Sequence, residues 1–290
     1  MKTIFLLPFT LLLPGVSLLS PSSPERGTTS GDAPLCHGIS NEMALLAASP
    51  AFQQLHENPL PYTHITASGE MVSFPTDDGA TARGFLLKAK KPSDKWLLVY
   101  QEWWGLNDHI KREAERIYND LDNVNVLAVD MYDGQVTDKR EEAARLVQSV
   151  KRERLGSIMK GAIAYAGPRA QIASIGWCFG GSMSLNSALL GGKQAVGCVI
   201  YYGRPELDSE RLKALQTDVL GIFGSKDKGI PPATVSQFEE AMKKAGETVT
   251  VKMYEADHAF ANPSNPAYDK EAAADAYRVS LDYLKKRLKA

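Results

Sequence analysis

Cysteine is scarce in this chain of 290 residues, which contains three: Cys36, Cys178 and Cys198. Because three is an odd number, at least one thiol stays unpaired or pairs outside the chain. Cys198 lies within an apolar run, residues 196–202, and we expect it to serve in packing.

Ligand pairs at metal-binding spacing are also lacking. Cys36 and His37 are adjacent, but no second pair of ligands follows nearby at the spacing of a metal site. We therefore expect structural roles for these two residues and for His56 and His64. The sequence predicts no metal and no other cofactor.

Charge of one sign is not in excess, because 33 Lys and Arg residues face 34 Asp and Glu residues, for a net charge of −1. This balance gives no support for a nucleic-acid partner or for binding to an anionic membrane. No internal repeat and no second domain are evident. The expected partner is a small molecule, and the oligomeric state is not predicted.

The first residues form a charged and then apolar segment. Met1-Lys2-Thr3 is followed by apolar residues from Ile4 to Leu19, interrupted by proline and glycine. This pattern predicts a signal peptide over residues 1–20, with a retained anchor as the alternative. We expect a periplasmic or secreted protein without stable membrane insertion after cleavage. Residues 21–67 then form a linker and a short N-terminal extension, and residues 68–290 form a catalytic domain.

Within that domain, short apolar runs alternate with segments of helical spacing. Such alternation predicts an α/β fold with a mainly parallel, doubly wound sheet and helices on both faces. A hairpin is expected at one edge, with its turn at Asp77-Asp78-Gly79. The runs that we expect to form the strands are 96–100, 124–129, 171–175, 196–202, 219–223 and 249–254.

One of these runs leads into Gly176-Trp177-Cys178-Phe179-Gly180-Gly181, followed at once by helical sequence. The pattern is that of the nucleophile elbow of α/β-hydrolases, with cysteine in place of serine. Its glycines leave room where a Cβ atom would collide with backbone. A thiol at a helix N-terminus is expected to have a pKa below its usual value of about 8.5. The alternative is that Cys178 is one more buried cysteine.

Two further polar residues follow later runs in the order nucleophile, acid, histidine. Asp227 comes after the run that ends at Phe223, and His258 after the run that ends at Tyr254. His258 would accept the thiol proton, and Asp227 would fix the imidazole tautomer. The alternatives are a turn-forming role for Asp227, a loop position for His258, and Asp257 as the triad acid.

Several blocks of sequence extend this pattern over nearly all of residues 69–290. On these blocks the chain resembles the dienelactone hydrolases, a family of the α/β-hydrolase superfamily. The blocks are residues 101–107, Asp130-Met131-Tyr132, residues 176–181, Tyr201-Tyr202-Gly203, Asp227 with Pro231, and residues 254–260.

The resemblance implies a triad of Cys178, His258 and Asp227. It also implies that Glu102 approaches the resting thiol and accepts its proton once substrate has bound. The backbone N–H groups of Trp103 and Phe179 would form the oxyanion hole.

The chain departs from the family at the residues that bind a substrate carboxylate. Two arginines of dienelactone-cleaving members are replaced by Gly134 and Asn262, and neither can bind a carboxylate in the bidentate manner of arginine. Arg204 or Lys228 could substitute, although neither matches a family position. The substrate-binding residues we expect are Trp104, Tyr132, Tyr202, Arg204, Phe260 and Asn262.

These expectations combine into one functional hypothesis. The chain would hydrolyse small carboxylic esters or lactones through Cys178 and a thioester intermediate. The alternatives are a binding protein that keeps the fold with weak or no catalysis, and an acyltransferase that passes the acyl group to an acceptor other than water.

Overall fold

The computed structural model describes Met1, Thr3 and residues 42–65 and 68–290. The chain divides into two units, Met1–Cys36 and His37–Ala290, and the architecture below belongs to the second. The predicted signal peptide, apart from Met1 and Thr3, and the pair Cys36-His37 lie outside the described residues.

An eight-stranded sheet forms the centre of the described domain, with the order β1-β2-β4-β3-β5-β6-β7-β8. β1 and β2 form an antiparallel hairpin at one edge, β2 is antiparallel to β4, and all other neighbours are parallel. The predicted mainly parallel sheet is confirmed. The strands are β1 Gly69–Pro75, β2 Thr81–Leu87, β3 Lys95–Tyr100, β4 Asn125–Val129, β5 Gln171–Trp177, β6 Ala195–Tyr201, β7 Val219–Gly224 and β8 Val249–Tyr254.

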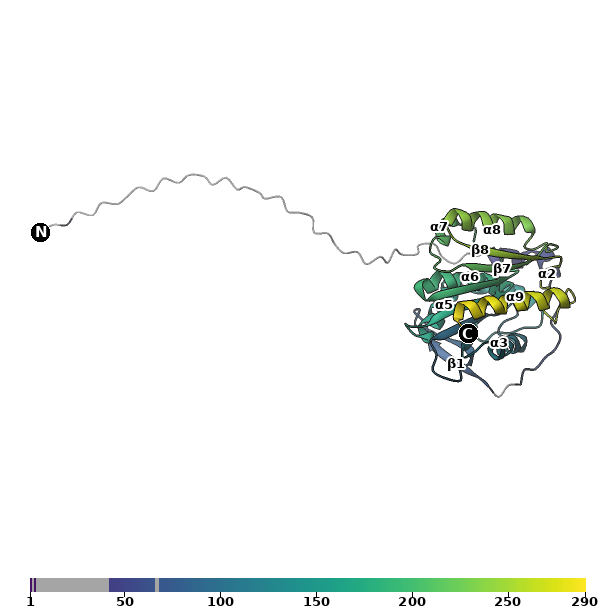
Figure 1. Cartoon of the computed structure of the whole chain (residues 1–290), viewed down its shortest axis with the longest axis horizontal. Helices are drawn as coiled ribbons and strands as arrows, with labels where there is room; N and C mark the ends of the chain where they lie inside the picture. Colours follow the sequence, from purple (N-terminus) through teal and green to yellow (C-terminus); the bar gives the residue numbers. More distant parts are fainter. Residues whose placement is uncertain (2, 4–41, 66–67) are drawn as a thin grey trace. The chain divides into compact units, whose positions relative to one another are not determined.

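Helices cover both faces of the sheet (Figure 1). α3 and α9 pack on one face, whereas α5, α6 and α8 pack on the other. The predicted doubly wound α/β-hydrolase architecture is thereby confirmed. The helices are α1 Glu42–Ala48, α2 Pro50–Gln54, α3 Asp108–Asp120, α4 Arg140–Ser149, α5 Arg152–Ala166, α6 Phe179–Gly191, the 3-10 turn η1 Gly192–Gln194, α7 Ser209–Leu212, α8 Pro232–Ala245 and α9 Lys270–Leu288.

Local sequence explains where these helices begin and end. The side chain of Asn107 accepts a hydrogen bond from the amide of Ile110 and so caps α3, whose buried face carries Ile110, Ala114 and Ile117. α8 begins at Pro232 and ends at Ala245, and the residue that follows, Gly246, has a left-handed conformation. Both ends of α8 agree with the sequence pattern.

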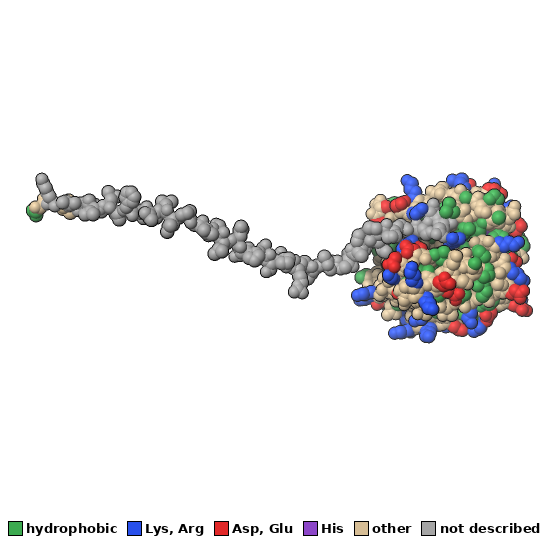
Figure 2. Space-filling view, turned by 90° about the horizontal axis from the view of Figure 1, so that it is seen from above, with side chains coloured by type: hydrophobic (Ala, Val, Ile, Leu, Met, Phe, Trp, Pro, Cys, Tyr) green, Lys and Arg blue, Asp and Glu red, His purple; other side chains and the backbone are tan. Residues whose placement is uncertain are grey.

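The visible face of the domain (Figure 2) is mixed in charge and carries some hydrophobic side chains. Figure 2 shows Lys and Arg side chains interspersed with Asp and Glu over the visible face. Among the described residues, no helix combines the length and the apolar character needed to cross a bilayer.

Residues 42–65, which we call the N-terminal strap, pack onto this domain. α1 and α2 lie against α4. The strap buries Met43 and Phe52, whereas Leu45 is exposed. Beyond α2, the carbonyl of Leu60 bonds to a ring nitrogen of His109 at 2.8 Å, and the amide of His64 donates to Asp108 at 3.0 Å. These contacts hold the strap along the N-terminal end of α3, beside the carboxyl edge of the parallel strands.

Candidate active site

Cys178 occupies a tight turn between β5 and α6. Its backbone has φ 54° and ψ −116°, a strained conformation for a residue with a side chain. A Cβ atom on Gly176 would lie 2.1 Å from the carbonyl oxygen of Gly180, so only glycine fits there. The turn therefore has the backbone geometry of a nucleophile elbow.

His258 and Asp227 meet beyond the ends of β8 and β7. Nδ1 of His258 donates to Oδ2 of Asp227 at 2.7 Å, and both side chains are buried. The other carboxylate oxygen of Asp227 accepts from the amides of Gly229 and Ile230 at 2.7 and 2.9 Å. Asp257 is exposed. The acid bonded to this imidazole is therefore Asp227.

The two groups stabilise each other's charged forms. Burial alone would lower the pKa of His258, but the Asp227 carboxylate and the Cys178 sulfur together raise that pKa above its usual value. Burial raises the pKa of Asp227, but the charge of His258 and the hydrogen bonds from His258, Ile230 and Gly229 together outweigh burial, so the net pKa is lowered. A proton taken up by His258 is thus retained beside an ionised carboxylate.

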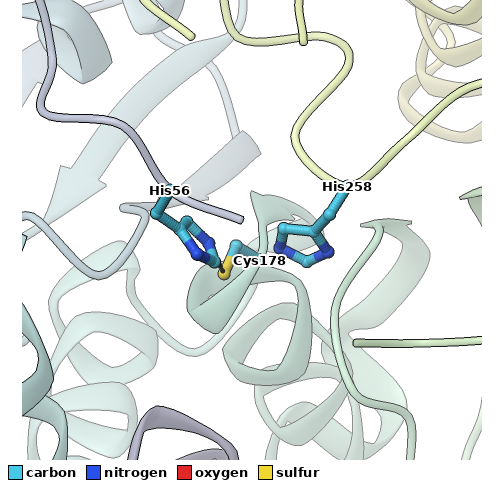
Figure 3. Close-up of side chains that lie close together, drawn as sticks. All are labelled: His56, Cys178 and His258. Atoms are coloured by element: carbon cyan, nitrogen blue, oxygen red, sulfur yellow. Dashed lines mark hydrogen bonds between the residues drawn. The ribbon is translucent and has the colours of Figure 1, made fainter. Parts of the chain in front are cut away.

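A second histidine lies against the thiol. Nε2 of His56, from the strap, is 3.5 Å from Sγ of Cys178, and Nε2 of His258 faces the same sulfur from the opposite side (Figure 3). Nδ1 of His56 bonds to the carbonyl oxygen of Phe52 at 3.0 Å, so Nδ1 carries the proton. Burial, followed by the charge of His258, lowers the pKa of His56 well below its usual value. His56 is therefore neutral, and its Nε2 accepts the thiol proton in a hydrogen bond.

Burial also determines the state of the thiol. Cys178 has no exposed surface, and burial raises its pKa, with a further increase from Glu102. His258 and the amide of Phe179 act in the opposite direction but do not offset the burial. The expectation of a lowered thiol pKa is therefore wrong for this closed site, because the strap removes the sulfur from water. The helix end acts in the expected direction but is the weaker effect.

Glu102 lies just beyond β3 and is held by two side chains. Asn262 donates to Oε2 at 2.6 Å, and the Tyr202 hydroxyl donates to Oε1 at 3.5 Å. Burial raises the pKa of Glu102 to about 7. In this arrangement the hydrogen-bond partner of the thiol is His56, and Glu102 acts on the sulfur through its charge.

The expected substrate-binding residues divide into three groups. Trp104, Tyr202 and Asn262 line one pocket, to which the expected catalytic residue Glu102 also contributes. Tyr132 packs on Phe179 with ring centroids 5.3 Å apart, and Phe260 packs on Tyr202 at 5.6 Å. The hydroxyl of Tyr132 has no hydrogen-bond partner among the described residues. For Arg204, the backbone carbonyl oxygen accepts a hydrogen bond from the Ser182 hydroxyl at 2.7 Å.

The two residues expected to form an oxyanion hole lie on either side of the elbow. Phe179 is the first residue of α6, where a helix leaves amide N–H groups without intrahelical acceptors. Trp103 follows β3, the strand that pairs with the elbow strand β5, and its side chain is fully buried. Phe179 thus directly follows Cys178, and Trp103 lies just beyond the strand that neighbours the elbow strand.

Comparison with known proteins agrees with this geometry. The family model described as "Dienelactone hydrolase family" matches residues 82–288. This chain belongs to the dienelactone hydrolase family. It is accordingly a dienelactone hydrolase-like hydrolase of the carboxylic ester class.

Individual members of the family are distant from this chain. A protein of Methylorubrum extorquens named "Putative carboxymethylenebutenolidase" is 29% identical over 234 residues, which cover 74% of this chain and 79% of that protein. The dienelactone hydrolase of Anabaena variabilis superposes with a TM-score of 0.56 at 16% identity, covering 80% and 99% of the two chains. A dienelactone hydrolase-like promiscuous phosphotriesterase from metagenomic libraries gives 0.65 at 21%, covering 76% and 99%. The two structures establish the fold.

The strap residues at the site were not found by sequence reasoning. We expected a structural role for His56, and no motif in the sequence drew attention to Phe52. Phe52 in fact packs against the rings of His56 and His258, with centroids 4.7 and 5.4 Å away. No motif surrounds either residue, because their position depends on how the strap docks rather than on local spacing.

Replacing Phe52 with alanine tests whether the strap covers the nucleophile. Phe52 is 3% exposed, and truncating a buried phenylalanine typically costs about 3–5 kcal/mol. We expect the strap to open more often and Cys178 to be alkylated at least about tenfold faster, as measured by mass spectrometry of the Cys178 peptide. Leu45→Ala is the control, because Leu45 is 72% exposed on the same strap. An unchanged rate in Phe52→Ala would show that something else covers the thiol.

Replacing Glu102 with glutamine should change how stability depends on pH. The usual pKa of 4.5 applies to the unfolded chain, and burial raises the folded value to about 7. Between these values unfolding releases a proton, so stability falls as pH rises through the window and is level above it. The difference between the folded and unfolded pKa of Glu102 corresponds to about 3 kcal/mol in the free energy of unfolding.

The measurement is urea unfolding of the wild type and Glu102→Gln at several pH values from 4 to 8. We expect the variant to gain up to about 3 kcal/mol relative to the wild type between the two ends, because all other titrating groups are shared. A difference between the two proteins that stays constant with pH would contradict the raised pKa of the buried Glu102 carboxyl group.

Proposed function

We propose that this enzyme hydrolyses small carboxylic esters or lactones with Cys178 as nucleophile, His258 as base and Asp227 as the residue that orients the base. The observation that carries the proposal is the hydrogen bond of 2.7 Å between His258 and Asp227, with the second nitrogen of His258 facing the sulfur on the elbow (Figure 3). That arrangement matches the roles of a nucleophile, base and acid triad.

The reaction begins when substrate displaces the strap from the sulfur. The thiol proton passes to Nε2 of His258, and the sulfur attacks the ester carbonyl carbon. The oxyanion that forms accepts hydrogen bonds from the amides of Trp103 and Phe179. His258 then protonates the departing alcohol, which leaves a thioester on Cys178. A water molecule, deprotonated by His258, cleaves the thioester and restores the thiol.

The pocket beside Glu102 combines aromatic surface with polar and charged side chains, among them Arg112 and Glu113, which form an ion pair with each other. Trp104, Trp177 and Tyr202 supply aromatic surface, and Asn262 supplies an amide. The names of relatives indicate a lactone, and the resemblance places carboxylate-binding arginines at the positions of Gly134 and Asn262. Without those arginines we propose an uncharged ester or lactone rather than one that carries a free carboxylate.

The test is hydrolysis of short p-nitrophenyl esters and of matched lactones with and without a carboxylate group. We expect turnover of the uncharged substrates, a loss of at least roughly 10³-fold in Cys178→Ser, and no loss in Cys198→Ser. Cys198 is also a buried free cysteine, which makes it the matched control. Turnover that survives in Cys178→Ser would refute the mechanism, whereas a preference for carboxylate-bearing lactones would refute the proposed substrate class.

A further inference from the structure

Three potential metal ligands converge at the nucleophile. His56, Cys178 and His258 are all buried, and each offers one ligand atom within 4.8 Å of the other two. Figure 3 shows that they come from separate parts of the fold: the strap, the elbow and the loop after β8. Proposed catalysis by Cys178, His258 and Asp227 gives no role to His56.

Each imidazole is oriented as a metal-binding histidine usually is. Nδ1 of His56 donates to the Phe52 carbonyl at 3.0 Å, and Nδ1 of His258 donates to Asp227 at 2.7 Å. Metal-binding histidines almost always donate their other ring N–H to a carbonyl or a carboxylate, which fixes the tautomer and the ring. The Nε2 lone pairs are therefore left for the space that both rings share with the sulfur.

That space contains an unsatisfied polar atom. Nε2 of His258 is buried and has no hydrogen-bond partner among the described residues. Rings of Phe52 and Trp103 pack around His56, with centroids 4.7 and 4.2 Å from its own. A buried, unpaired nitrogen in such an apolar surrounding is costly unless a ligand engages it.

We propose that His56, Cys178 and His258 bind Zn²⁺ and that the bound metal keeps the enzyme in a closed, inactive state. One thiolate and two imidazoles suit zinc, which takes four ligands in a tetrahedron at about 2.3 Å from sulfur and about 2.0–2.1 Å from nitrogen. Those bond lengths place the ligand atoms about 3.3–3.6 Å apart. The distance from His56 to the sulfur is already 3.5 Å.

Binding would have two chemical consequences. As the bonds to zinc form, the thiol loses its proton to solvent and His258 loses any proton on Nε2, so at least one proton is released for each metal ion bound. The sulfur and the Nε2 lone pair of His258 are then both occupied, and neither can take part in ester cleavage. Because His56 belongs to the strap, the metal also holds the strap over the site. A chelator that removes the metal would free Cys178 and His258 for catalysis and would no longer leave the strap held over the site.

Cobalt titration of the reduced full chain tests the site directly, because Co²⁺ replaces zinc and a cobalt–thiolate bond absorbs in the near ultraviolet. We expect one Co²⁺ per chain with this band, displaced by Zn²⁺. The band should be absent in Cys178→Ser. Affinity should fall at least about 100-fold in His56→Ala, since even loss of an outer contact costs about 10–100-fold.

Two controls separate this site from adventitious binding. Cys198→Ser removes a buried cysteine elsewhere, and the double variant Cys36→Ser/His37→Ala removes the other candidate ligand pair of the sequence. Both should bind Co²⁺ as the wild type does. A band that persists in Cys178→Ser, or one that disappears in the double variant, would overturn the proposal.

A measurement on the wild type covers the case in which His56→Ala does not fold. Zn²⁺ should slow alkylation of Cys178 at least about tenfold, in line with occupancy above about 90% at ten times Kd, and a chelator should restore the rate. Equal alkylation with and without Zn²⁺ would overturn the proposal. These readouts do not depend on ester hydrolysis, so the failure of either proposal can be recognised separately.

Discussion

Replacing His258 with alanine is expected to lower kcat for a short ester by at least roughly 10³-fold, because removal of the base from a nucleophile triad disables it as a unit. Nε2 of His258 faces the sulfur, while Nδ1 donates to Asp227 at 2.7 Å, so a proton taken from the thiol lies beside a carboxylate. Asp227→Asn should retain more activity, since it weakens the orientation and charge of the base without removing the base.

His56→Ala is the matched variant for this experiment, since both imidazoles face the same sulfur. His56 faces a neutral carbonyl, and burial holds its pKa well below the usual value, so it cannot retain the thiol proton as a cation. We expect His56→Ala to reduce kcat far less than His258→Ala, in assays with a chelator present. The reverse order, measured in the same assay, would mean that His56 is the base.

Replacing Gly180 with alanine should destabilise the domain by more than about 4 kcal/mol, which is exceptional for a single substitution. An added Cβ atom would lie 2.3 Å from the carbonyl oxygen of Tyr100 and 2.4 Å from that of Gln101. Both are backbone atoms at the end of β3, which is paired on both sides in the sheet, so neither can move away cheaply. Urea unfolding measures the loss.

Gly79→Ala is the control for that substitution. Nothing lies within 4 Å of a Cβ atom at Gly79, and only its φ of 78° opposes a side chain. A left-handed conformation costs a residue with a side chain about 1–2 kcal/mol. If Gly180→Ala lowered the free energy of unfolding no more than Gly79→Ala does, the elbow would not approach β3 as closely as the structure shows.

Most of the fold and part of the site could be predicted from the sequence, because strand-forming runs and the residues that follow them are recognisable there. The runs before Cys178 and Asp227 are short and apolar, as expected for buried strands. The run before His258 alternates apolar with polar residues and forms β8, the partly exposed strand at the edge of the sheet. The carboxyl ends of parallel strands share one edge, so residues that follow such runs meet there. The hydrogen bond between His258 and Asp227 agrees with that reasoning. The reasoning requires only the order of the strands along the chain and no detail of side-chain packing.

The strap could not be placed in this way. Contact between His56 and Cys178 joins residues 122 positions apart, and α2 has only five residues, too few for a periodic pattern to reveal its buried face. The unpredicted position of the strap also explains the wrong expectation for the thiol pKa. The helix N-terminus can be recognised in the sequence, but the strap that buries the sulfur cannot. Side-chain environments that depend on docking need the structure.

The central claim is that Cys178 carries the acyl group during ester cleavage. The most direct test mixes the enzyme with a p-nitrophenyl ester, quenches in acid during turnover, and locates the acyl group by peptide mass spectrometry. We expect one acyl group on the peptide that contains Cys178, none on the peptide that contains Cys198, and none on any peptide of Cys178→Ser. Turnover with no acyl group on Cys178 would contradict the mechanism.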